Sequence, residues 1–263
     1  MIAYQLAATA AAALTALVIF RVVLEWTPRR AAVMAGLAYL LMLGPLEGFS
    51  GQAPVFYNFA IALAGWLVWR AHAYGQDSRL AIAALLCGCA LTVKQTTLFE
   101  SAFLLGFALW SLRRRGVALA GRAVGLGVVF ALPMAAIVAG YAVIGHWPEF
   151  WHAMVTSNLV KAPLLPEELA HQAASLAVRI AVPVALAVWG LAGRPAMASS
   201  PRPFLIGWLL AGLAGLISVP HFFPHYALPW LVPLCLAAGL GFARTSGAAV
   251  AFALTVINAF TWY

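Results

Sequence analysis

The chain has 263 residues, of which 65% are hydrophobic and 8% are charged, and its formal net charge is +8 at pH 7. In soluble domains about a quarter of the residues are charged, so this composition excludes a soluble protein and indicates a polytopic membrane protein. Basic residues in such chains normally follow the cytoplasmic-loop bias, so the positive charge does not indicate a nucleic-acid partner.

The first predicted element is a span over residues 2–24. It lacks the basic n-region and the small-residue cleavage site of a signal peptide, so we expect it to be retained. About 20 apolar residues suffice for one crossing, and the sequence predicts an all-α fold of about ten spans in a single integral-membrane domain, residues 1–263. Several apolar runs are short, which favours kinks or half-depth helices. The other predicted spans are 31–46, 54–70, 80–94, 97–112, 117–145, 175–192, 204–219, 228–243 and 246–262.

If each predicted span crosses the membrane, successive connections lie on alternate sides, and this assignment separates most basic residues from most acidic residues and histidines. Most basic residues fall on one side, which the positive-inside rule assigns to the cytoplasm. These residues are Arg21, Arg29, Arg30, Arg70, Arg79, Arg113, Arg114, Arg115, Arg122, Arg194, Arg202 and Arg244. The opposite side holds Lys94, Lys161, Arg179, Glu47, Glu100, Glu149, Glu167, Glu168, His146, His152, His171, His221 and His225. We therefore expect any chemistry, and both chain termini, on the extracytoplasmic side.

Two short polar segments come first on that side. Residues 45–54 contain glycines and prolines that predict a tight turn, and Glu47 is its one acid. Residues 92–97 place Lys94 between two apolar runs. A lysine facing lipid is costly, so Lys94 either snorkels to the headgroups or faces a cavity or a phosphate.

The longest polar connection, residues 146–174, follows and begins His146-Trp147-Pro148-Glu149-Phe150-Trp151-His152. This pattern is typical of a helix lying in the membrane interface. A third polar segment, residues 219–230, contains His221, His225 and Tyr226 among three prolines. The prolines predict a helix end, a turn and a helix restart. The segment is either an interfacial aromatic belt or a functional use of histidine.

Three motifs on the outer side together resemble bacterial glycosyltransferase family 39. They are Glu47-Gly48-Phe49-Ser50-Gly51-Gln52, Leu91-Thr92-Val93-Lys94-Gln95-Thr96 and His221-Phe222-Phe223-Pro224-His225-Tyr226. The resemblance covers roughly residues 5–245, and Phe150-Trp151-His152-Ala153 with Asn158 is similar to the family's long outer loop. It implies a multi-pass plasma-membrane protein of the cell envelope with the GT-C fold, related to the protein O-mannosyltransferases.

The resemblance also implies a reaction, the transfer of a sugar from a polyprenyl-phosphate donor to an acceptor hydroxyl or amine. Lys94, Gln95, His221, His225 and Tyr226 would then bind the donor phosphate. Glu47 would be the catalytic base, although it is equally compatible with an acid at headgroup level. The expected partners are the lipid-linked sugar and membrane lipid. Neither the sugar nor the acceptor is specified, and nothing in the sequence argues for a cofactor or a bound divalent cation.

The chain departs from the family pattern at two places. His221 stands where the family commonly has arginine, and histidine is a weaker, pH-dependent phosphate partner. The family also has an upstream span and a first outer loop with an acidic residue, so we expect a family member without its beginning. The alternatives are a transporter or lipid-carrier-binding membrane protein without catalysis, or an inactive scaffold fragment.

Overall fold

The structure is a computed structural model that describes all residues except 1, 158–163, 194–199, 220, 246 and 263. Every regular element in the described ranges is helical, which confirms the predicted all-α class. Four of these helices are long and apolar enough to cross a membrane, so the membrane character is also supported. They are Ile2–Leu24, Leu119–Val143, Pro166–Ala192 and Pro224–Arg244.

A long helix occupies each of the predicted spans. The long helices are α1 (Ile2–Leu24), α2 (Arg29–Met42), α3 (Ala53–Tyr74), α4 (Leu80–Val93), α5 (Thr97–Arg114), α6 (Leu119–Val143), α9 (Pro166–Ala192), α10 (Arg202–Ile217), α11 (Leu228–Arg244) and α12 (Ala248–Phe260). Short elements join them: η1 (Gly48–Ser50), η2 (Asp77–Arg79), α7 (Trp147–Trp151), the π-helical turn η3 (His152–Thr156) and η4 (Pro224–Ala227). That every long helix crosses a membrane stays a prediction.

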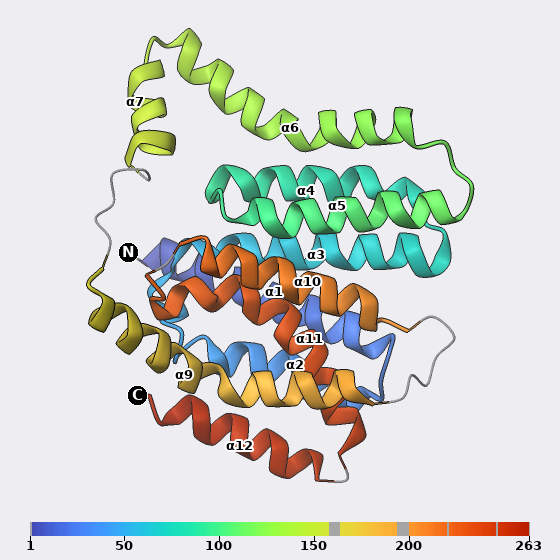
Figure 1. The fold of residues 1–263 in the computed structure, drawn as a ribbon, viewed down its shortest axis with the longest axis vertical. Helices are drawn as coiled ribbons and strands as arrows, with labels where there is room; N and C mark the ends of the chain where they lie inside the picture. Colours follow the sequence, from blue (N-terminus) through green and yellow to red (C-terminus); the bar gives the residue numbers. More distant parts are fainter. Residues whose placement is uncertain (1, 158–163, 194–199, 220, 246, 263) are drawn as a thin grey trace.

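Most long helices run back and forth between the left and right ends of the molecule in Figure 1. At the left end, α2 turns into α3, α4 turns into α5, and α10 turns into α11 through η4. The three polar segments that carry the predicted site residues therefore lie at one end. The arginine-bearing turns, from α1 to α2, α3 to α4 and α5 to α6, lie at the other end. This is the segregation that the charge pattern predicts.

Helix α11 is the central element of the packed core, in contact with α1, α2, α3, α9, α10 and α12. Its contact with α9 is close because small residues face each other. A Cβ atom on Gly190 would lie 2.4 Å from the Ala237 carbonyl oxygen and 2.6 Å from the Gly241 nitrogen. Small residues allow membrane helices to approach at backbone distance, so α9 and α11 pack closely at this point.

The predicted outer connection 146–174 is shorter than expected, because α9 begins at Pro166 rather than near residue 175. Pro166 is the first helical residue, and Glu167 and Glu168 follow in the first turn. The first residue of a helix has no intrahelical partner for its amide, so proline is well tolerated there. The two carboxylates interact favourably with the positive end of the helix dipole, so this polar stretch can start a helix. The predicted helical character of the start of the connection agrees with α7 and η3. Asn158 of the resembling loop and Lys161 of the charge count lie outside the described residues, as do Met1, Arg194, Pro220 and Tyr263.

Helix α4 is short, and Lys94 follows it directly. It has 14 residues, which corresponds to a rise of about 21 Å. The apolar layer of a bilayer is about 30 Å thick, so a helix of this length ends before crossing it completely. Lys94, the residue after α4, is in extended conformation with φ −155° and ψ 131°, and α5 starts again at Thr97. Helix α4 is therefore shorter than a full crossing requires, and Lys94 lies directly at its end.

Candidate functional site

The turn that carries Glu47 meets the turn that carries His225. Glu47 Oε2 lies 3.3 Å from His225 Nδ1, and the glutamate side chain is about half exposed. Both turns contain a non-glycine residue with positive φ, Glu47 at 58° and Phe222 at 48°. Such backbone conformations are uncommon for these residue types and persist where surrounding structure enforces them, often at functional sites. The carboxylate and the imidazole are thus held together by two irregular turns.

Lys94 joins this pair through an aromatic ring. Its Nζ atom lies 4.4 Å from the centroid of the Tyr226 ring, which is a cation–π distance. The rings of His225 and Tyr226 are 4.6 Å apart in an edge-on arrangement. Glu47, His225, Tyr226 and Lys94 therefore form a continuous chain of contacts, which we call the rim cluster. The structure brings these four predicted site residues together from three separate turns.

The two other predicted site residues lie beside the rim cluster. The His221 ring stacks on Phe223 at 5.9 Å, and Phe223 stacks on His225 at 6.0 Å. His221 Nδ1 is buried and has no hydrogen-bond partner among the described residues. Gln95 donates from Nε2 to the backbone carbonyl of Met154 at 2.6 Å, so its amide ties the α4–α5 turn to η3. His221 thus continues the rim, whereas Gln95 contacts η3 in the connection between α6 and α9.

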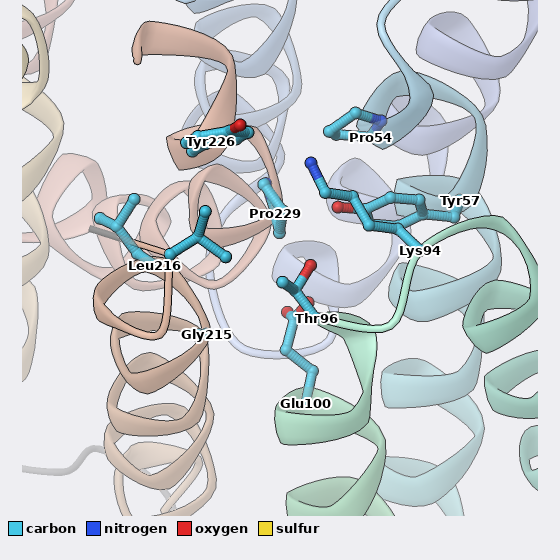
Figure 2. A pocket seen from close by; sticks show the side chains of 11 residues that line it. Pro54, Tyr57, Lys94, Thr96, Glu100, Gly215, Leu216, Tyr226 and Pro229 are labelled. Carbon is cyan, nitrogen blue, oxygen red and sulfur yellow. The ribbon is translucent and has the colours of Figure 1, made fainter. Parts of the chain in front are cut away.

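A narrow pocket opens beneath Lys94 (Figure 2). Its cavity of about 20 Å³ has room for one water molecule or one group of similar size. Figure 2 shows the amine of Lys94 near the mouth, with Tyr226 and Pro54 around it, and Thr96 and Glu100 farther in. The pocket is lined by Pro54, Tyr57, Lys94, Thr96, Glu100, Gly212, Gly215, Leu216, Val219, Tyr226 and Pro229.

Glu100 places a carboxylate at the inner end of this pocket. It belongs to the first turn of α5 and is 2% exposed. Trp208 of α10 donates from Nε1 to Glu100 Oε1 at 2.8 Å. Trp208 can lie there because Gly65 of α3 has no side chain: a Cβ on Gly65 would be 2.1 Å from the indole. The carboxylate is therefore held in a set orientation by residues of three helices.

Two polar residues of the pocket, Tyr57 and Glu100, have no role predicted from the sequence. Glu100 has a recognisable signal, since an ionisable side chain within a membrane helix usually faces the interior and marks a functional site. It also follows Lys94 by six positions, across a helix break. Tyr57 has no such signal, because a tyrosine in an apolar helix is normally a packing or interfacial residue.

The connection between α6 and α9, and α9 itself, also reach this end of the molecule. Arg179 donates from Nη1 to the Pro45 carbonyl at 2.5 Å and lies 4.3 Å above the ring of Trp262, so it anchors the turn before Glu47. On α7, a hydrogen bond from backbone lowers the pKa of Glu149, and the neighbouring His146 lowers it further. The described residues contain no group of three or more His, Cys, Asp or Glu placed to hold a metal ion.

Comparison with known proteins finds no matching family model, no matching curated protein and no matching solved structure.

Proposed function

We propose that this protein is a membrane glycosyltransferase that transfers a sugar from a polyprenyl-phosphate donor to an acceptor on the extracytoplasmic face of the plasma membrane. The observation that supports this most is the rim cluster, which joins Lys94, His225 and Glu47 through Tyr226, and of which Lys94 and Tyr226 line the pocket. A leaving phosphate needs cations, and an acceptor hydroxyl needs a carboxylate to take its proton. The cluster contains both kinds of group.

The residues would divide the reaction as follows. Lys94 and His225, with His221, Gln95 and Tyr226 around them, hold the donor phosphate at the end of the short helix α4. The bond between the sugar carbon and the phosphate oxygen breaks, and a new bond forms from that carbon to the acceptor. The acceptor proton passes to Glu47. Electrostatic contacts at a site next to lipid are stronger than in water, because the lipid lowers the effective dielectric.

A polyprenyl-phosphate donor requires a membrane-embedded architecture, which is part of the proposal. It includes about ten crossings, a GT-C-like core and an outer location of the rim cluster. The arginine-rich turns at the opposite end of the molecule support this orientation through the positive-inside rule. The isoprenoid chain of the donor would then lie in the membrane while its phosphate reaches Lys94.

The test is to measure donor binding and sugar transfer on the same purified protein in lipid nanodiscs. Polyprenyl-phosphate mannose and polyprenyl-phosphate glucose serve as donors. Glu47→Gln should leave donor affinity unchanged and lower transfer by about 10²- to 10⁴-fold, as expected for loss of a general base. Glu149→Gln is the matched control, because Glu149 is also an outer carboxylate beside a histidine, at 3.5 Å from His146.

Two results would count against the proposal. If neither donor binds, the assignment of the rim cluster to a lipid phosphate is wrong. If the donors bind but the wild-type chain transfers no sugar to any acceptor offered, the result favours a lipid-carrier-binding protein without catalysis.

A further inference from the structure

The pocket beneath Lys94 has a polar inner end that donor-phosphate binding does not explain. Tyr57, Thr96 and Glu100 contribute two hydroxyl groups and a carboxylate to its lining. Tyr57 is 2% exposed, and its hydroxyl makes no hydrogen bond of normal length, although the Thr96 hydroxyl is a polar neighbour. Buried polar groups in proteins are nearly always fully paired, so a hydroxyl buried at a pocket with Thr96 as its one close polar neighbour has hydrogen-bonding capacity left for a ligand.

Glu100 has acceptor capacity beyond its contact inside the protein. Trp208 donates one hydrogen bond to Oε1, whereas a carboxylate can accept about four. Figure 2 shows the Glu100 carboxylate beside Thr96, directed toward the space below Lys94. Because the cavity measures about 20 Å³, one hydroxyl group fits this inner end and a sugar ring does not.

Together these features define a site for one ligand hydroxyl next to a site for an anion. We propose that Glu100 and Tyr57, with Thr96, form a recognition subsite for one hydroxyl of the donor sugar, while the sugar ring stays at the mouth beside Lys94 and Tyr226. This inference rests on the proposed function, since it identifies how that same site would distinguish a sugar-bearing lipid phosphate from the bare one. A protein site built to bond a hydroxyl discriminates strongly against ligands that lack it.

The experiment compares two probes, polyprenyl phosphate and polyprenyl-phosphate mannose, on protein in nanodiscs. The dissociation constant of polyprenyl phosphate divided by that of polyprenyl-phosphate mannose measures how much the sugar adds to affinity. Glu100→Gln and Tyr57→Phe should each lower this ratio by about tenfold, the size expected for one hydrogen bond to a buried group. Both variants should leave the affinity for polyprenyl phosphate unchanged, because Lys94 and the histidines remain.

Two further variants control for structural effects. Gly215→Ala adds a methyl group to the lining, where it would meet the Thr96 carbonyl at 3.4 Å, an ordinary contact distance. It should therefore narrow the pocket, keep the fold and lower the ratio. Tyr74→Phe, at the other end of the same helix α3, removes a tyrosine hydroxyl that is far from the pocket in sequence and should leave the ratio unchanged.

The outcomes separate this inference from the proposed function. Loss of the sugar-dependent ratio in Glu100→Gln and Tyr57→Phe, with polyprenyl phosphate binding intact, supports the subsite. Equal ratios in the wild type and these variants overturn the subsite, and so does a wild-type ratio of one. Neither result contradicts the phosphate site. If polyprenyl phosphate itself fails to bind, the proposed function fails first.

Discussion

Replacing Lys94 by methionine tests the phosphate site most directly, because it keeps the length of the side chain and removes its charge. Lys94 is partly buried at the pocket mouth, and Tyr226 is the aromatic partner of its amine at 4.4 Å. The methionine thioether can still pack against this ring, since sulfur–aromatic contacts are favourable. The variant should therefore fold and lose mainly the charged contact with the ligand.

The expected size of the effect follows from the position of the amine. A hydrogen bond to a charged group contributes about 1.5–3 kcal/mol net of desolvation. Each ~1.4 kcal/mol corresponds to a tenfold change in affinity, so Lys94→Met should weaken binding of polyprenyl-phosphate mannose by about 10- to 150-fold. His225→Ala should weaken binding less. The imidazole lies 3.3 Å from the Glu47 carboxylate, so part of its interaction is already made within the protein.

Binding is measured by titration of the lipid into protein in nanodiscs of fixed, zwitterionic composition. Arg122→Met is the charge-matched control, since it removes one positive charge from an exposed position at the start of α6, at the arginine-rich end. A general loss of attraction to anionic lipid would affect both variants equally. Equal donor affinity in the wild type and Lys94→Met would refute the assigned phosphate site, whatever the membrane topology proves to be.

Two predictions concern the fold that holds the site. Gly190→Val should lower the free energy of unfolding by about 1–3 kcal/mol, because its side chain would overlap the α11 backbone at Ala237; thermal unfolding in detergent measures this. Gly125→Val on α6, where no atom lies within 4 Å of an added Cβ, should change stability much less, and similar losses in both would argue against close α9–α11 packing. A cysteine in place of Tyr263, in a chain whose exposed Cys89 is changed to serine, should react with an impermeant reagent from outside intact cells. Reaction only after the cytoplasm is opened would contradict the predicted topology.

The sequence alone was sufficient for the order of the helices and for the end of the molecule at which each polar turn lies. Apolar runs and the breaks between them are local properties, and antiparallel neighbours alternate ends whatever their lateral arrangement. Glu47, Lys94 and His225 could therefore be assigned to one side before any contact was known. The start of α9 at Pro166 was missed because a polar first turn reads as a loop until its helical dihedral angles are seen.

Only the tertiary structure decided which of those residues meet, and what lies beneath them. Glu47 and His225 are 178 positions apart, and Glu100 and Trp208 are 108 apart, so no periodic pattern links either pair. Their contacts depend on lateral packing, which is set by where glycines such as Gly65 and Gly190 let helices or bulky side chains approach. Hydrophobicity specifies that a helix is buried in the bundle, whereas the shapes of the facing side chains specify its neighbours. The pocket that joins Lys94 to Glu100 and Tyr57 is a product of that packing.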